Sequence, residues 1–323
     1  MNNHVVALCG GVGGAKLAHG LALALNAQDL SIIVNTGDDF QHLGLRISPD
    51  LDSVIYALAA LSDPIRGWGR RDETWKFMEA LKGLGGEDWF QLGDADLALH
   101  VERSWRLAQG ATLSEVTAHF CKALGILPRV LPISDDPVRT RVLTEEGWLD
   151  FQEYFVQRQC RPAVRSLAFA GASSARAQPN ALAALIRPDL RAIIICPSNP
   201  FLSVEPILAV PEIRAAIQRS EAPVVAVTPI IAGKAIKGPA AKMMAELGFE
   251  VSGAAVARYY ADLIDGFILD QADLIPEPVP GIEFFRAATL MIHDEDRVRL
   301  ANAALRVADT LSGAAHEPVA GVL

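Results

Sequence analysis

Short apolar runs rich in valine and isoleucine recur along the chain and constrain its fold more than any other feature. Helix-like segments separate several of these runs, an alternation that predicts a mostly parallel, doubly wound sheet. Strands covered by helices on both faces are apolar almost throughout, as these runs are. They lie at residues 5–8, 30–34, 192–196, 224–227 and 267–269. We therefore predict an α/β protein with a Rossmann-like core and a ligand site at the carboxyl ends of the strands.

The middle of the chain has a different pattern and predicts an inserted, smaller α+β subdomain. Two helix-like segments lie near residues 97–108 and 113–124. Beyond them, two strand-like runs flank the polar sequence Thr-Glu-Glu-Gly at residues 144–147, which is typical of an antiparallel hairpin. We assign residues 1–60 and 165–323 to a nucleotide-binding core and residues 61–164 to the insertion.

Composition excludes several classes of partner. The chain has 323 residues, of which 51% are apolar and 21% charged, so it can bury a large core. Its net charge of −9 argues against a surface that binds nucleic acid. The four cysteines have no metal-ligand spacing, and neither a signal-peptide pattern nor a run long enough to cross a membrane is present. We expect a reduced, cytoplasmic protein without nucleic-acid or membrane partners.

Four glycines follow the first predicted strand, at Gly10, Gly11, Gly13 and Gly14, and precede a helix-like run that starts at Ala15. Glycines let a ligand approach the backbone closely, and a helix N-terminus offers unpaired N–H donors. The stretch therefore predicts a phosphate-binding turn, with a tight turn that binds nothing as the alternative. It matches neither the dinucleotide-binding fingerprint nor the P-loop, so it does not identify the ligand.

Two acidic clusters lie near this turn in the predicted fold. Asp38 and Asp39 follow the second strand, and Asp50 and Asp52 lie in the first turn of a helix-like run for which Ser48 is a suitable N-cap. Carboxylates in a first helical turn also offset the helix dipole, so a purely structural role stays open for this pair. Opposite a phosphate-binding turn, however, these carboxylates predict a Mg²⁺ site, because Mg²⁺ prefers one or two carboxylates together with phosphate oxygens.

Other polar residues have both a functional and a structural interpretation. Asp94 is a further acidic candidate or a helix start, and Asn199 could bind a base or ribose or form a rigid turn between prolines. Lys234 and Lys237 could contact a phosphate or carboxylate, although lysines in a loop are usually solvated.

The order of these motifs resembles one family, the 2-phospho-L-lactate transferases, which build a deazaflavin coenzyme. Each motif alone is weak, but their succession over most of the chain is specific. The motifs lie at residues 10–17, 35–39, 48–53, 92–98, 197–200 and 229–234.

The resemblance implies an activity, a cofactor and an assembly. A phospholactyl, phosphoenolpyruvyl or phosphoglyceryl group would pass from a guanosine diphosphate ester to the ribityl hydroxyl of the deazaflavin precursor Fo. GMP would be released, Mg²⁺ would be required, and the protein would be a homodimer. Phosphoryl transfer depends mainly on positioning and on neutralising charge, which fits these residues. No residue identifies the donor.

The resemblance also assigns roles to individual residues. Trp68 and Arg70, with Trp75, could cover the flat tricyclic ring, although a buried core is an equal alternative for the tryptophans. The assigned residues are Asp50 and Asp52 for catalysis; Asp39, Asp50, Asp52 and Asp94 for Mg²⁺; Gly10, Gly11, Gly13, Gly14 and Lys16 for the diphosphate; Ser198 and Asn199 for the guanosine part; and Lys234 for an anionic group.

Two other readings of the fold compete with the transferase. The first is a regulatory protein that binds a uridine diphosphate sugar without catalysis, which residues 48–52 argue against. The second is a nicotinamide-dependent oxidoreductase, in which Asp38 would hold a ribose. That reading is weakened by Lys16, which stands where the third glycine of the fingerprint would be.

Overall fold

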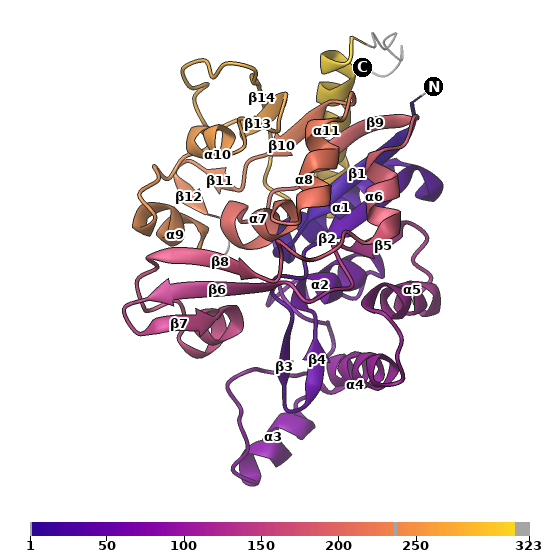
Figure 1. Ribbon diagram of the computed structural model, residues 1–323, viewed down its shortest axis with the longest axis vertical. Helices are drawn as coiled ribbons and strands as arrows, with labels where there is room; N and C mark the ends of the chain where they lie inside the picture. Colours follow the sequence, from indigo (N-terminus) through magenta and orange to yellow (C-terminus); the bar gives the residue numbers. More distant parts are fainter. Residues whose placement is uncertain (1, 236–237, 314–323) are drawn as a thin grey trace.

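The computed structural model describes residues 2–235 and 238–313 (Figure 1). Within them, seven strands form one parallel sheet in the order β14-β13-β10-β9-β1-β2-β5. This is the predicted doubly wound α/β fold. The strands are β1 (His4–Cys9), β2 (Leu30–Val34), β5 (Arg129–Pro132), β9 (Leu190–Ile195), β10 (Val224–Val227), β13 (Gly266–Asp270) and β14 (Glu283–Ala287).

The sheet grows outward in two directions from β1. The strands β2 and β5 lie on one side of it, and the strands from β9 onward lie on the other. Such a switch point places the loops after its two central strands on opposite sides of a crevice where ligands bind. Leu8 of β1 pairs with Ile195 of β9, so the chain leaves both strands at the same level. The switch point is therefore the expected place for the site.

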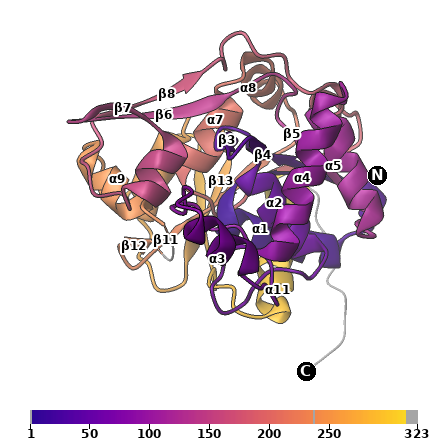
Figure 2. The same ribbon diagram turned by 90° about the horizontal axis from the view of Figure 1, so that it is seen from below.

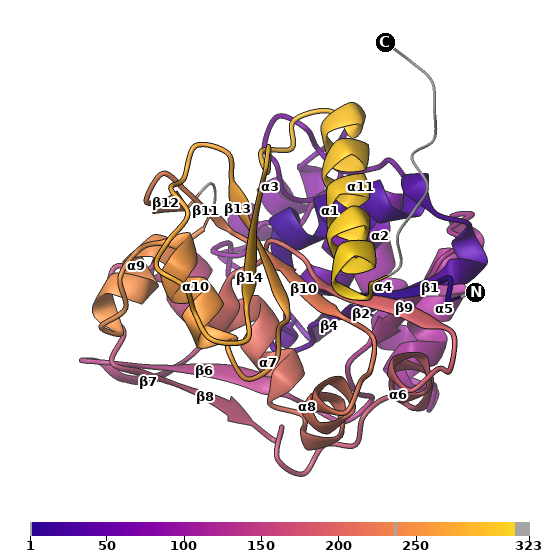
Figure 3. The same cartoon turned by 90° about the horizontal axis from the view of Figure 1, so that it is seen from above.

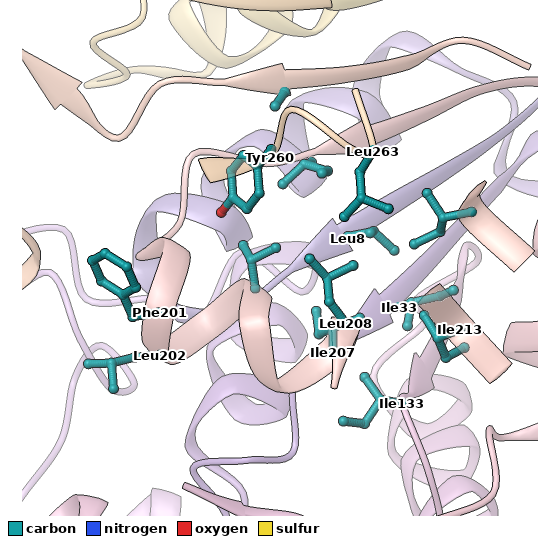
Figure 4. Packing of buried hydrophobic residues seen from close by; sticks show 14 of the residues in the cluster. Leu8, Ile33, Ile133, Phe201, Leu202, Ile207, Leu208, Ile213, Tyr260 and Leu263 are labelled. Carbon is teal, nitrogen blue, oxygen red and sulfur yellow. The ribbon is translucent and has the colours of Figure 1, made fainter. Parts of the chain in front are cut away.

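Alternating side chains of β1 belong to two separate cores. Val5, Ala7 and Cys9 pack with the helices of one layer, and Val6 and Leu8 pack with those of the other. Figure 3 shows helices on both faces of the sheet, and Figure 4 shows Leu8 among the side chains of the second core. The first layer contains α1 (Gly11–Ala24), α2 (Pro49–Leu58), α5 (Leu113–Ala123) and α11 (Asp294–Leu311). The second contains α6 (Pro179–Leu185), α7 (Glu205–Leu208), α8 (Pro211–Gln218), α9 (Ala240–Glu246) and α10 (Gly253–Tyr259).

Several smaller elements extend from the carboxyl ends of the strands, toward the lower end of the molecule in Figure 1, and Figure 2 shows them from below. A third, small core around Ile47, Met78 and Leu92 holds one group of them together. This group comprises the hairpin of β3 (Phe40–His42) and β4 (Leu45–Ile47), the helix α3 (Lys76–Gly83) and part of α4 (Asp94–Ala108). The predicted hairpin is confirmed as β6 (Arg139–Thr144) and β7 (Gly147–Asp150), and β8 (Ser166–Ala170) pairs with β6 as well. The remaining short elements are η1 (Ala27–Asp29), η2 (Glu153–Gln157), η3 (Pro200–Val204), β11 (Ile230–Ile231) and β12 (Lys234–Ala235).

Two strands of the main sheet were not among the predicted runs. The edge strand β14 carries charged residues at both ends of a short aromatic pair, and β5 ends in a proline, so neither looks like a buried strand. Because β5 lies within residues 61–164 and pairs with β2, part of the range that we assigned to the insertion belongs to the main sheet. The division into two units otherwise stays a prediction. Among the described residues, no helix has the length and apolar character to cross a membrane.

Candidate active site

The glycine-rich stretch is the first turn of a helix rather than a loop before one. The helix α1 begins at Gly11, four residues earlier than the sequence predicted, with Gly10 as its N-cap. Among these glycines only Gly11 has a positive φ, of 63°. The prediction placed the start at Ala15 because glycine disfavours helices, but contacts with neighbouring segments override that preference here.

These glycines allow three chain segments to approach each other closely. A Cβ atom on Gly13 would overlap the carbonyl oxygen of Pro197, and one on Gly14 would overlap the hydroxyl of Ser198. A Cβ atom on Gly10 would lie 2.7 Å from Asp50 Oδ2. The Ser198 hydroxyl in turn donates to the Gly10 carbonyl at 2.8 Å. The segment after β9 and the helix α2 both pack closely against the start of α1, and this close packing accounts for the glycines.

Asp50 is held at the N-terminus of α1. Its Oδ1 accepts a hydrogen bond from the Gly11 amide at 2.7 Å, and its Oδ2 accepts one from Asn35 Nδ2 at 2.9 Å. The side chain is only 4% exposed. Burial raises the pKa of Asp50 to about 6, although both hydrogen bonds favour the ionised form. A buried carboxyl that titrates near neutral pH therefore lies beside a helix start at the switch point.

The turn after β2 brings two further carboxyls to the same place. Asn35 Nδ2 also contacts Asp38 Oδ1 at 3.1 Å, and burial together with the Asp50 charge raises the pKa of Asp38. Asp39 Oδ2 accepts a hydrogen bond from the Ser48 hydroxyl at 2.8 Å, whereas its buried Oδ1 has no hydrogen-bond partner in the described part of the chain. Burial raises the pKa of Asp39 to about 7. Ser48 is the N-cap residue of α2 as predicted, but its hydroxyl binds Asp39 instead of capping the helix.

Asp52 faces away from this group, as its spacing of two residues from Asp50 predicts. Both of its oxygens bind the guanidinium of Arg103, which is 1% exposed. His100 Nδ1 lies 3.7 Å from Asp52 Oδ2, and His100 Nε2 lies 3.3 Å from Asp96 Oδ2. Burial raises the pKa of Asp52, and Arg103 opposes that rise. Asp52 is thus part of a buried polar network between α2 and α4.

Asp94 lies at a helix start and acts as a cap for a neighbouring helix. Its carboxylate accepts hydrogen bonds from the Thr74 hydroxyl and from the amides at the start of α3. In return, Glu73 accepts the amides of Ala95 and Asp96 at the start of α4. A side chain on Gly93 would collide with Glu73, which explains the glycine before Asp94. These contacts correspond to the structural interpretation of this acidic motif.

Several residues assigned to the donor have partners within the protein. The Lys16 ammonium donates to the carbonyl of Met291 at 2.8 Å. Asn199 Oδ1 accepts the amides of Phe201 and Leu202, which is the predicted rigid turn, but its buried Nδ2 lacks a hydrogen-bond partner among the described residues. Lys234 lies in β12 with its side chain exposed, and Lys237 falls outside the described residues.

The aromatic residues predicted to cover a flat ring form a partly exposed cluster. Trp68 is 48% exposed, so a buried core is the wrong interpretation for it. The guanidinium of Arg66 lies 5.8 Å from the ring centre of Trp68 and 4.6 Å from that of Trp75. Arg70 pairs with Ser62 in an isolated bridge. Arg66, which the sequence analysis did not single out, thus joins the two tryptophans.

Sequence reasoning did not single out three residues that shape the site. Asn35 joins Asp38, Asp50 and the carbonyl of Leu202 through one amide group, and Arg103 binds Asp52 from 51 positions along the chain. The Thr140 amide of β6 donates to the Gly37 carbonyl at 2.8 Å and ties the small sheet to the turn after β2. Of these, only Asn35 had a local signal, its place directly after a strand.

The described residues contain no cluster of three or more His, Cys, Asp or Glu side chains arranged to hold a metal ion. A Mg²⁺ ion bound mainly by substrate phosphate needs fewer protein ligands, because one or two carboxylates and water complete its shell. Asp39 and Asp50 have the required chemistry at the carboxyl ends of the strands.

Fold and site together define a doubly wound α/β protein that gathers buried carboxyls beside a helix start at the switch point of its sheet. Comparison with known proteins identifies the family. The family model described as "2-phospho-L-lactate transferase CofD" matches residues 5–311. The chain belongs to this CofD family, and it is a transferase.

Relatives with two different names resemble the chain to a similar degree. A phosphoenolpyruvate transferase from Kitasatospora aureofaciens is 41% identical over 315 residues, which cover 94% of this chain and 98% of the relative. A 2-phospho-L-lactate transferase from Methanopyrus kandleri is 40% identical over 317 residues, which cover 97% and 100%. A solved structure of a UPF0052 family protein from Bacillus halodurans superposes with a TM-score of 0.60 at 17% identity, covering 94% of this chain and 99% of that one. This last match supports the fold.

Proposed function

We propose that the protein transfers a phospholactyl, phosphoenolpyruvyl or phosphoglyceryl group from a guanosine diphosphate ester to the ribityl hydroxyl of Fo, releasing GMP. Membership of the CofD family and the names of the relatives support a transfer of this type. The observation that carries the proposal is the Asp50 carboxyl, fixed by the Gly11 amide and Asn35 at the switch point. That is where a doubly wound sheet binds its ligands.

The transfer requires one bond to form and one to break at phosphorus. The acceptor hydroxyl oxygen bonds to the phosphorus that carries the acid group, and the bond from this phosphorus to the bridging oxygen breaks. GMP leaves with that oxygen, and the hydroxyl proton passes to a carboxylate. We assign this proton to Asp50, because a carboxyl with a pKa raised to about 6 is a better base than an ordinary aspartate and is still ionised at neutral pH.

The residues at the site fit a Mg²⁺ ion. Asp39 presents a buried oxygen without a hydrogen-bond partner among the described residues, and carboxylate oxygens are the ligands that Mg²⁺ prefers. We propose that Asp39 holds the ion together with phosphate oxygens and water, and that the ion would neutralise charge on the diphosphate. Asp50, whose two oxygens accept hydrogen bonds from Gly11 and Asn35, keeps the role of base. Asp52 and Asp94 are left out, because Arg103 and the α3 amides already occupy their oxygens.

The start of α1 and the segment after β9 are the proposed walls for the donor. Amides in the first turn of a helix have no partner within that helix and attract anions, so those that follow Gly11 are suited to a diphosphate. The amide nitrogen of Asn199, which lacks a partner among the described residues, would donate to the guanosine part. The exposed Trp68 and the nearby Arg70 remain our candidates for the tricyclic ring of the acceptor.

The deciding experiment supplies purified protein with Fo, Mg²⁺ and each of the three donors in turn, and detects product and GMP by mass spectrometry. The proposal expects turnover with at least one donor and none when Mg²⁺ is removed. Absence of turnover with every donor, together with binding of a uridine diphosphate sugar, would establish the regulatory alternative instead. We also propose a homodimer, and light scattering that shows only monomer would refute it.

A further inference from the structure

We propose that Arg103 is a positioning residue for the transfer. Through Asp52 it fixes the first turn of α2, and that turn sets the place of the Asp50 carboxyl against the start of α1. The inference rests on the proposed function for the role of Asp50. In this proposal, the buried pair of Arg103 and Asp52 affects the reaction indirectly, and neither side chain touches the substrate.

Arg103 is an anchor between four elements. Its guanidinium binds both oxygens of Asp52 on α2, with Nη1 at 3.1 Å from Oδ2. The same Nη1 donates to the carbonyl of Arg46 on β4 at 3.3 Å, and the guanidinium lies 5.6 Å from the ring centre of Phe120 on α5. Arg103 itself belongs to α4. A planar guanidinium with fixed donors holds such an arrangement better than a lysine could.

The pair is extended by a second carboxylate. His100 lies between Asp52 and Asp96, and the Tyr56 hydroxyl donates to Asp96. Every group in this chain of contacts belongs to α2 or α4, so the network fixes the two helices relative to each other. Polar networks that are satisfied and buried restrict a structure to one arrangement.

The first turn of α2 links this polar network to Asp50, the proposed base. Asp52 and Asp50 are two residues apart in that turn, and the Asp52 amide closes it by donating to the Ser48 carbonyl at 2.9 Å. The Ser48 hydroxyl in turn binds Asp39. A displacement of the turn would therefore move Asp50 away from Gly11 and disturb Asp39 at once. A misplacement of about 1 Å is enough to cost about 100-fold in rate.

A purely structural role predicts a different outcome. Removal of one partner of a buried ion pair leaves the other charge uncompensated, so a purely structural role predicts a lower melting temperature with each folded molecule fully active. The positioning role predicts slower chemistry in molecules that remain folded. It also predicts a looser start of α1, because the Gly11 amide would lose a well-placed acceptor.

The test compares Arg103→Lys and Arg103→Met with the wild type, and uses Arg191→Met as a matched control. Arg191, near the start of β9, forms a two-bond ion pair with Asp309 on α11, at the opposite end of the main sheet from the proposed site. We expect kcat to fall about 10- to 100-fold for Arg103→Met, with KM for the donor changed by less than about 3-fold. Arg103→Lys keeps the charge and should recover part of kcat. Arg191→Met should leave both constants unchanged.

A second measurement is independent of turnover. Hydrogen exchange, followed by mass spectrometry, is compared in peptides that contain Gly11 and in peptides from α11. Both Arg103 variants should accelerate exchange around Gly11, whereas Arg191→Met should not. Unchanged exchange around Gly11, or a kcat equal to that of the wild type per folded molecule, would overturn the positioning role. If the wild type turns over no donor, the proposed function fails, and the exchange result alone still decides whether Arg103 fixes the start of α1.

Discussion

The carboxylates at the two ends of the main sheet differ in their partners and in their pKa values. At the amino end, Arg187 binds both oxygens of Asp189 at 2.8 Å, and Arg191 binds those of Asp309 at 2.9 and 2.7 Å. The hydrogen bonds from Arg187 lower the pKa of Asp189. At the carboxyl end, burial raises the pKa of Asp39 to about 7. Direct ion pairs hold the carboxylates of Asp189 and Asp309 at the amino end, whereas Asp39 and Asp50 at the carboxyl end are buried with raised pKa values.

The cavity with the volume given below does not lie beside the carboxyls whose pKa values are raised. A cavity of about 1290 Å³ opens at the amino end, where its lining includes Arg187, Arg191 and Asp309. The carboxyl end instead holds the buried Oδ1 of Asp39, which has no hydrogen-bond partner among residues 2–235 and 238–313. Because perturbed titratable groups cluster at functional sites, we take the raised pKa values of Asp39 and Asp50 as a better guide to the active site than this cavity. The two ends can be compared directly by experiment.

The largest effect is expected for Asp50→Asn. Turnover should fall by about 1,000-fold or more, because the amide cannot accept the hydroxyl proton. The fold should survive with a lower melting temperature, because the amide nitrogen of the asparagine would face a donor, either the Gly11 amide or Asn35 Nδ2. Asp189→Asn, at the amino end, should show normal turnover. Near-normal rates for Asp50→Asn would show that this carboxylate is not the base and only stabilises the start of a helix.

The next largest effect is expected for Gly13→Ala. The added methyl group would collide with the Pro197 carbonyl, which is backbone and cannot rotate away, so unfolding free energy should fall by about 1–3 kcal/mol. Denaturant titration measures the loss. The matched variant is Gly83→Ala at the end of α3, where no other segment of the described chain comes within 4 Å of the added carbon, and it should be neutral or stabilising by up to about 1 kcal/mol. Equal stability of the two variants would contradict the close packing of α1 against the segment after β9.

A smaller effect concerns pH. The folded-state pKa values of Asp39 and Asp50, about 7 and about 6, lie above 3.8, the ordinary value of an aspartate. Between these limits the folded state binds more protons than the unfolded state, so stability falls as pH rises. In the absence of divalent ions, the melting temperature should therefore drop by several degrees from pH 5 to pH 8. Asp39→Asn should flatten this dependence, and a slope unchanged by that variant would count against the buried, ionisable state of Asp39.

The smallest effect is expected at the amino end, for Arg191→Met. This pair is partly exposed, with 22% of the arginine side chain and 10% of the aspartate side chain accessible, so stability should fall by only about 1 kcal/mol. Thermal unfolding in the same buffer series checks this value. A change in the pH dependence of stability would show that the two ends are coupled.

The sequence predicted the parts of the fold that depend on local pattern. Continuous apolar runs identified β1, β2, β9, β10 and β13, because helices cover both sheet faces there. The edge strand β14 was not predicted, because Glu283 and Arg286 interrupt its apolar pattern. The start of α1 was misplaced because packing against Pro197 and Ser198, which no local propensity reveals, decides it.

The sequence also predicted part of the candidate site. Position after a strand correctly brought Asp38 and Asp39 to the same end of the sheet as Gly11 and Asp50. The difference between Asp50 and Asp52 could not be foreseen in full, because the partner of Asp52 is Arg103, whose place depends on how α4 packs. Asp94 looks like another acidic ligand in the sequence, but its oxygens are taken by amides that only the folded chain brings near.

The close approach of α1 to the segment after β9 also limits how the protein can evolve. Gly13 and Gly14 leave no space beside Pro197 and Ser198, so a larger residue on one segment is acceptable only if the other retreats. Substitutions in these two segments should therefore arise as matched pairs, although more than 180 positions separate them in the sequence. Engineering of the proposed donor site would have to redesign both segments together.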